Sequence, residues 1–257
     1  MRVVVLGSGS AGNSLVVESG GRRILIDAGF SCRELEKRCD LVGVAPESLE
    51  AVVLTHEHGD HSRGADRLAR RFGLEVYGTA GTLQSLSWSE GARGMLRPVA
   101  SGWPYEVGGF SVESFSVAHD AREPVGLAVQ DEEGSRLGLV ADLGTWSRLA
   151  AARLRDLGIL ILEANHDLDM LRTGPYPWSL KQRVASRHGH LSNHQAAECL
   201  PEIIGDDLRW LVLYHLSRTN NNPALAAATV GEALDRAGSS ARLAVAAQSQ
   251  PSSWLEV

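Results

Sequence analysis

The run His56-Glu57-His58-Gly59-Asp60-His61 is the feature that most constrains this chain. It places three imidazoles and two carboxylates within six residues, directly after the apolar run 51–54. Imidazole nitrogen and carboxylate oxygen are ligands that divalent zinc, manganese or iron accept in proteins. A solvated polar loop is the alternative interpretation, but chance rarely places an H-x-H-x-D-H run behind a buried strand. We therefore predict that this loop turns its side chains toward two adjacent metal positions.

Composition favours one large α/β domain. The chain has 257 residues and is 44% hydrophobic, enough for a sizeable core, so we predict a single domain over 1–257. The net charge of −6 excludes a generally basic surface, and a polyanionic substrate would need a local patch. Three cysteines without C-x-x-C spacing indicate buried free thiols in a reducing cytoplasm. No apolar run approaches the roughly 20 residues that span a membrane, so we predict a soluble, cytoplasmic protein without a membrane partner.

Short apolar runs alternate with turn signals and with helical periodicity along the chain, which is typical of an α/β fold. The predicted strands cover 3–6, 15–17, 24–26, 51–54, 110–117, 126–129, 137–140, 159–162, 211–213 and 242–246. The predicted helices cover 33–41, 63–72, 80–88, 193–200 and 223–237.

Three further candidate ligands, His119, Asp142 and His215, each follow a predicted strand. A lone histidine beside a strand is usually structural, but three such placements beside the histidine loop favour ligation. Asp142 is the natural bridge, because one carboxylate can give an oxygen to each of two ions roughly 3.5–4 Å apart. We assign the first ion to His56, His58 and His119, and the second to Asp60, His61 and His215. A hydroxide between the ions, formed because bound metal lowers the pKa of water, is the expected nucleophile.

The order Asp27, histidine loop, His119, Asp142 and His215 resembles the metallo-β-lactamase superfamily over nearly the whole chain. The resemblance implies a four-layer αβ/βα sandwich with two divalent metal ions at the end of the two sheets. It also implies that Asp27 supports the histidine loop by hydrogen bonds and does not ligate.

Glu163 and His190 resemble the phosphodiesterase branch of that superfamily, typified by ribonuclease Z. Glu163 follows the predicted strand 159–162, and His190 precedes a predicted helix. The resemblance implies that His190 protonates the departing oxygen while Glu163 orients the imidazole and raises its pKa. The alternative is that His190 belongs to a helix-capping network.

Several phrases are similar to the small bacterial WalJ group, also called YycJ. They occupy 8–14, 163–167, 170–171, 174–177, 189–193, 215–217 and 220–222. This resemblance implies a 5′-to-3′ exonuclease on double-stranded DNA with manganese as activator, although histidine-rich ligation also suits zinc. The preference for DNA over RNA and the polarity depend on the resemblance alone, and the oligomeric state stays open.

Substrate contacts are expected from loops near these groups. Lys181 and Arg183, with Arg187 and His188, form a basic edge that could hold backbone phosphates, or else a plain solvated helix face. Ser217, Asn220 and Asn221 could bond a terminal phosphate, or else form a polar turn.

Four more residues near the proposed site have less certain roles. For Tyr176 and Trp178 we prefer core or loop packing to stacking on an end base. His166 stays open as an extra ligand or phosphate contact, and Asp120 as a residue that orients His119.

We therefore predict a metal-dependent hydrolase, a two-metal phosphodiesterase in which Asp60 orients the hydroxide and His190 donates a proton. The alternatives are a small-molecule metallohydrolase acting on a thioester or lactone, and an RNA-processing nuclease. A regulatory protein that binds metal or nucleotide without turnover is a further alternative.

Overall fold

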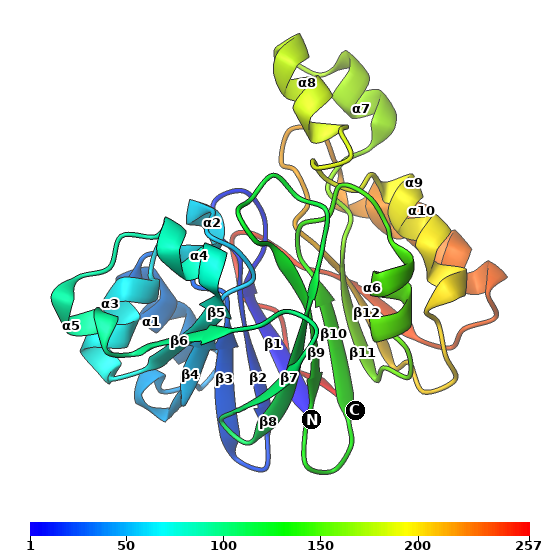
Figure 1. Ribbon diagram of the computed structural model, residues 1–257. Coiled ribbons are helices and arrows are strands. Elements are labelled where there is room, and N and C mark those ends of the chain that lie inside the picture. The colour runs from blue at the N-terminus through cyan, green and yellow to red at the C-terminus, as the bar shows by residue number, and fades with distance from the viewer.

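Two seven-stranded sheets pack face to face in the computed structural model, which describes residues 1–257 (Figure 1). In spatial order the first sheet consists of β14 (Leu255–Glu256), β1 (Arg2–Gly7), β2 (Ser14–Ser19), β3 (Arg22–Ile26), β4 (Ala51–Val53), β5 (Glu75–Thr79) and β6 (Leu96–Val99). The second consists of β13 (Arg242–Val245), β12 (Trp210–Tyr214), β11 (Ile159–Glu163), β10 (Arg136–Val140), β9 (Val125–Gln130), β8 (Phe110–Ser116) and β7 (Pro104–Val107). Strands β3 to β6 pair in parallel, as do β10 to β13, and the other neighbours pair antiparallel.

Helices cover the outer face of each sheet (Figure 1). On the first sheet these are α1 (Cys32–Leu41), α3 (Ala65–Phe72), α4 (Ala80–Ser85) and α5 (Glu90–Arg93), and on the second α6 (Arg148–Arg153), α9 (Asn193–Cys199) and α10 (Pro223–Arg236). Short 3₁₀ helices occupy Pro46–Ser48 and Leu200–Glu202. Helix α2 (Gly59–Ser62) lies at the upper edge in Figure 1, where α7 (Leu168–Thr173) and α8 (Trp178–Val184) project from the sandwich.

Apolar side chains alternate between the two faces of each strand. In β1, Val3 and Val5 pack between the sheets, whereas Val4 and Leu6 pack under the helices of the first sheet. In β11, Ile161 likewise faces the first sheet. Successive side chains of a strand point to opposite faces of the sheet. When both faces are buried, every position is apolar and the strand is a continuous apolar run. This arrangement confirms the predicted four-layer αβ/βα sandwich.

One predicted helix is too long. The helix expected over 80–88 ends at Ser85, and Leu86 is extended at φ −98° and ψ 151°. The indole Nε1 of Trp88 donates a hydrogen bond to the carbonyl of Leu83 at 2.7 Å. The tryptophan therefore satisfies a helix-terminal carbonyl that a further helical turn would otherwise have bonded.

The cysteines agree with the prediction of buried free thiols. All three are buried and none is in a disulfide. Burial raises the pKa of Cys32 to about 11 and of Cys39 to about 12, which suppresses the reactive thiolate form. As for the helices, none combines the length and apolarity needed to cross a bilayer.

Among the glycines, Gly29, between β3 and the histidine loop, leaves the least space for a Cβ. A Cβ at this position would overlap the carbonyl oxygen of Asp60 and come within 2.6 Å of the Asn13 nitrogen. The Asn13 N–H donates to that same Asp60 carbonyl at 2.7 Å. Glycine therefore lets the segment after β3 pack directly against the loop backbone.

We expect Gly29→Ala to lower the free energy of unfolding by about 1–3 kcal/mol, because overpacking must displace the loop backbone. The same displacement should reduce the amount of bound metal. Chemical denaturation and metal analysis of the purified variant measure the two effects.

Gly94→Ala is the matched control, because a Cβ there meets nothing within 4 Å and the residue has a φ of −69°. It should retain stability and metal content. Equal stability of both variants would contradict the close approach at Gly29.

Candidate metal centre

The predicted ligands meet at one edge of the sandwich, across the boundary between the two sheets. Four of them follow β4 of the first sheet, namely His56, His58, Asp60 and His61. Three follow β8, β10 and β12 of the second sheet, namely His119, Asp142 and His215. Parallel strands deliver their carboxyl ends to the same edge, which brings together residues far apart in sequence.

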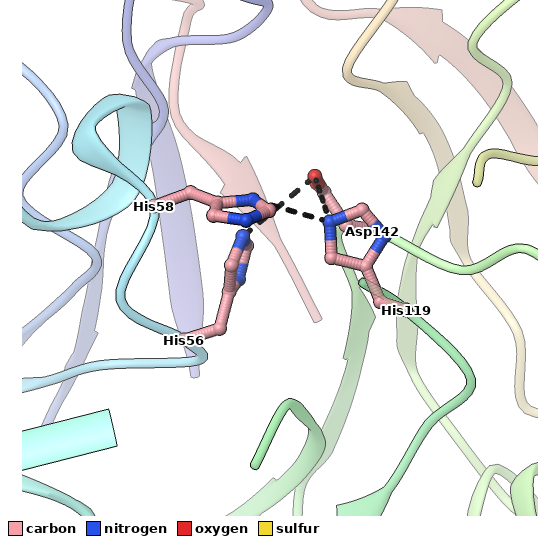
Figure 2. A group of neighbouring side chains, drawn as sticks. All are labelled: His56, His58, His119 and Asp142. Carbon is pink, nitrogen blue, oxygen red and sulfur yellow. Dashed lines mark hydrogen bonds and ion pairs between the residues drawn. The ribbon is translucent and has the colours of Figure 1, made fainter. Parts of the chain in front are cut away.

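The first set consists of His56, His58, His119 and Asp142, whose ligand atoms lie within 4.8 Å of one another. His119 Nε2 is 3.3 Å from His58 Nδ1 and 3.4 Å from Asp142 Oδ2. His56 Nε2 is 3.8 Å from the same carboxylate oxygen. Figure 2 shows the three rings and the carboxylate converging on one point. These are the residues predicted for the first ion, together with the predicted bridge.

The second set consists of Asp60, His61 and His215, also with ligand atoms within 4.8 Å. His215 Nε2 is 3.4 Å from Asp60 Oδ2, and His61 Nε2 is 3.3 Å from Asp142 Oδ1. Asp142 therefore presents Oδ2 to the first set and Oδ1 to the second, as a bridging carboxylate requires.

Buried ligand atoms without hydrogen-bond partners test whether this site fits a metal ion. His56 Nε2, His215 Nε2 and Asp142 Oδ1 are buried without a hydrogen-bond partner. An unpaired buried polar atom costs about 1–3 kcal/mol of folding free energy. Three such atoms in the two adjacent ligand sets therefore indicate that other groups bind there. Nitrogen and carboxylate oxygen converging in this way fit divalent metal ions.

Hydrogen bonds behind the ligands fix their orientation. Asp27 Oδ2 accepts from His61 Nδ1 at 2.7 Å, while Oδ1 accepts from the Thr55 N–H at 2.8 Å. His119 Nδ1 donates to the Gly189 carbonyl at 2.9 Å. Each bond engages Nδ1 and so turns the Nε2 of its imidazole toward the ligand set. Asp27 also has a φ of +58°, an uncommon conformation for a residue other than glycine.

The electrostatics balance buried carboxylates against buried imidazoles. Burial alone would raise the pKa of Asp142, but His215 and His61 hold it well below its usual value. Burial would lower the pKa of His61, but Asp142 and Asp27 outweigh it and raise the pKa to about 10. Burial dominates at His56, whose pKa lies well below its usual value.

Glu163 is fully buried and uses both of its oxygens. Oε1 accepts from His190 Nδ1 at 2.6 Å and from His215 Nδ1 at 3.2 Å. Oε2 accepts from the N–H groups of Leu143 at 2.8 Å and Leu191 at 3.1 Å. Glu163 therefore supports its neighbours by hydrogen bonds, and one of its oxygens also lies within 4.8 Å of possible ligand atoms of Asp142, His190 and His215.

His190 lines the cavity beside the ligands, and its Nδ1 is held by Glu163. Burial lowers its pKa, but the Glu163 carboxylate outweighs burial and raises it. The side chain of His190 takes no part in the capping box of α9, which Ser192 and Gln195 form. With Nδ1 engaged, Nε2 is the ring nitrogen available to a substrate.

The ligands open into a polar cavity of about 380 Å³. Three of its fifteen lining residues are hydrophobic, whereas sites for apolar small molecules are mostly apolar. Besides ligand residues and His190, the lining includes Ser10, Asp120, Asn165, Tyr176, Leu180, Arg183, Val184 and Ser217. This composition suits a charged substrate.

The structure brings two of the five predicted substrate residues to the cavity, Ser217 and Arg183. Asn221 is turned inward, since its amide bonds Asn193 and the Ala164 carbonyl. Asn220 is 1% exposed and does not line the cavity. Lys181 also lies outside the lining, with Nζ donating to the Arg172 carbonyl at 2.8 Å.

The two residues of open role lie at different distances from the ligands. His166 is 1% exposed and belongs to neither ligand set. Burial lowers its pKa to about 4, so its ring is neutral near neutral pH. Asp120 lies 3.4 Å from His119 Nε2, but it accepts a hydrogen bond from Arg183 Nε. The Gly189 carbonyl, not Asp120, bonds the other ring nitrogen of His119.

Sequence reasoning missed three supporting residues. Thr55 Oγ1 bonds Asp27 and lies 3.0 Å from His56 Nδ1. Asn13 Nδ2 lies 2.9 Å from His61 Nε2, and Gly189 contributes only a backbone carbonyl. The place of Thr55 directly before the histidine loop is a signal that could have identified it, whereas a carbonyl leaves none.

Comparisons with known proteins agree with this geometry. Residues 22–216 match the family model of the beta-lactamase superfamily domain. The chain is 35% identical to exodeoxyribonuclease WalJ of Streptococcus pneumoniae, covering 91% of this chain and 88% of that protein. It is also 35% identical to exodeoxyribonuclease YycJ of Bacillus anthracis, covering 91% of this chain and 89% of that protein.

The fold has solved counterparts as well. The crystal structure of zinc-bound PqqB from Methylobacterium extorquens superposes with a TM-score of 0.73, at 22% identity and 100% coverage of both chains. The predicted resemblance and the prediction of a hydrolase are confirmed by these relationships. The chain belongs to the beta-lactamase superfamily and, within it, to the family that contains the WalJ and YycJ exodeoxyribonucleases.

Proposed function

We propose that this protein is a phosphodiesterase with two divalent metal ions that degrades double-stranded DNA from the 5′ end. The observation that carries the proposal is the Glu163–His190 pair, which lies beside the ligand sets and faces the same cavity. Hydrolysis of a phosphodiester releases a strongly basic alkoxide, which needs a proton from such a group. Because both sheets contribute ligands, the proposal treats residues 1–257 as one catalytic domain.

The first ion would be held by His56, His58 and His119, and the second by Asp60, His61 and His215, with Asp142 between them. Bound there, the ions would supply an activated hydroxide and neutralise the charge of the scissile phosphate. Manganese is the proposed activator, while the imidazole-rich donor set also suits zinc.

The side chains of the chain itself would perform the remaining tasks. Asp60 would orient the attacking group, because its carboxylate borders both the cavity and His215. His190 would donate the proton from Nε2, and Glu163 would hold its ring in place. Arg183 and Ser217, on the cavity wall, would contact phosphate oxygens.

DNA as substrate is supported by the 35% identity to two exodeoxyribonucleases over most of the chain. The polar cavity argues against a thioester or lactone substrate, which would call for more apolar lining. The RNA nuclease alternative differs only in the nucleic acid, and the first experiment below distinguishes it.

With manganese, we expect the purified protein to release label from 5′-labelled duplex DNA as mononucleotide or short oligonucleotide, without a ladder of longer products. Processing from the labelled end removes the label in the first steps, which accounts for that pattern. Denaturing gel electrophoresis over time measures the products, and the same assay on RNA tests the alternative.

His58→Ala and Asp142→Asn are the controls, and both should lose activity together with metal. Full activity of Asp142→Asn would contradict the metal assignment. Absence of cleavage of DNA and RNA with every divalent ion tried would favour a small-molecule hydrolase or a binding protein.

We expect His190→Ala to lower kcat on DNA about 10²- to 10⁴-fold while metal content is retained, because general acid catalysis contributes that much. The loss should be much smaller on bis(p-nitrophenyl) phosphate, whose leaving group is weakly basic. Steady-state kinetics on the two substrates and metal analysis measure the difference. Equal losses on both substrates would show that His190 does not act as the proton donor.

A further inference from the structure

The projecting segment formed by α7 and α8, residues 168–189, is a part of the molecule that the proposed catalytic chemistry leaves largely unused. We name it the α7–α8 hairpin, and it stands out beyond the sandwich edge in Figure 1. Its buried residues are Leu171, Val184 and Gly189. No residue of the hairpin belongs to the apolar cores of the sandwich.

The hairpin is nevertheless tied to the catalytic residues. The His190 N–H donates to the Val184 carbonyl at 2.9 Å, and the Gly189 carbonyl accepts from His119. Arg183 pairs with Asp120, the residue after His119. These bonds fix the hairpin relative to both the proposed proton donor and the first ligand set.

One side of the hairpin forms a wall of the catalytic cavity. Tyr176, Leu180, Arg183 and Val184 all line it. The last three lie at i, i+3 and i+4 of α8, so they share one face of the helix. A DNA end bound in the cavity would therefore contact the hairpin along this wall.

Trp178 begins α8 and is exposed, contrary to the preferred prediction of core or loop packing. Its exposed fraction is 69%, and Leu168 of the same hairpin is 49% exposed. Trp178 is the first residue of α8, two positions after the cavity-lining Tyr176. A large aromatic ring that contributes to no core is available to a partner that contacts the hairpin.

Charge indicates the chemistry of that partner. The hairpin carries four cationic side chains against one carboxylate, in a chain where Asp and Glu outnumber Lys and Arg by 31 to 25. The cations are Arg172, Lys181, Arg183 and Arg187, and the carboxylate is Asp169. Arg172 pairs with Asp169 and Arg183 with Asp120, so Lys181 and Arg187 are the cations that form no ion pair within the protein. A local cationic patch with an exposed aromatic ring is the combination that binds phosphate backbones and stacks on bases.

We propose that the α7–α8 hairpin is the end-binding surface for DNA, with Trp178 stacked on the terminal base and the cationic side chains on nearby phosphates. This inference rests on the proposed nuclease function. A duplex exposes the flat face of a base only at its ends. The hairpin thus explains why a single polar cavity would act on ends and leave internal phosphodiesters intact.

The test compares Trp178→Ala with the wild type on blunt 5′-phosphorylated duplex DNA and on bis(p-nitrophenyl) phosphate, both with manganese. Trp178→Ala should lower the ratio of kcat/KM for the duplex to kcat/KM for the small substrate by a factor of about 5 to 140. This decrease is equivalent to about 1–3 kcal/mol of lost stacking. Most of the fall should come from KM for the duplex. Trp178→Phe should restore most of the ratio, because phenylalanine still stacks.

Trp103→Ala is the matched control, since Trp103 is 73% exposed and lies outside the α7–α8 hairpin. It should keep the wild-type ratio. The inference is overturned if Trp178→Ala keeps that ratio too, or if it loses activity equally on both substrates. Failure of the proposed function has a different outcome, in which the wild type hydrolyses the small substrate and leaves duplex DNA intact.

A second variant tests the phosphate contacts independently of stacking. Arg187→Gln should reduce by about 1 the slope of log KM for duplex DNA against log salt concentration, because one phosphate contact is lost. An unchanged slope would show that Arg187 does not belong to the DNA-binding surface.

Discussion

The burial of the Asp142 carboxylate is the constraint on which the site depends. The residue is 5% exposed, and removing a carboxylate from water costs several kcal/mol unless positive charge compensates it. Compensation comes from both sheets, with His61 Nε2 at 3.3 Å on one side and His215 Nδ1 at 3.0 Å on the other. The face-to-face packing of the sheets thus brings these groups together, and bound cations would neutralise the carboxylate further.

The histidine loop depends on a second carboxylate, that of Asp27. Its oxygens bond the backbone and hydroxyl of Thr55 and the ring of His61, so the ends of β3 and β4 are joined through one side chain. The left-handed φ of +58° at Asp27 is a strained conformation of the kind that persists where surrounding contacts determine it. Close contact at Gly29 adds to this, because the loop backbone lies directly on the segment that follows Asp27.

The sequence predicted those parts of the site that depend on local spacing or on strand ends. The histidine loop, His119, Asp142 and His215 all follow strands, and strand ends are readable from apolar runs. Side-chain direction in loops is not readable in this way. Ser217 and Asn221 belong to the same polar segment, yet one lines the cavity and the other bonds the backbone inside the protein.

The α7–α8 hairpin is a second feature that the sequence did not predict, in this case at the level of secondary structure. Its helices have six and seven residues, too short for helical periodicity to stand out. The exposure of Trp178 depends on where the whole hairpin projects, which is a property of the tertiary structure. The sequence favoured core or loop packing for Trp178, and its side chain is instead exposed.

Glu163 links the proposed proton donor to the proposed metal site, because it binds His190 and His215 with the same oxygen. One oxygen, Oε1, accepts from both His190 and His215, while the other is held by two backbone N–H groups. His190 can give up the proton on Nε2 without losing its bond to Glu163, because that bond uses Nδ1. His215 uses its own Nδ1 for the same oxygen and keeps Nε2 for the ligand set. A single buried carboxylate therefore fixes the orientation of the proposed proton donor and of a proposed metal ligand, so a change at Glu163 would affect both.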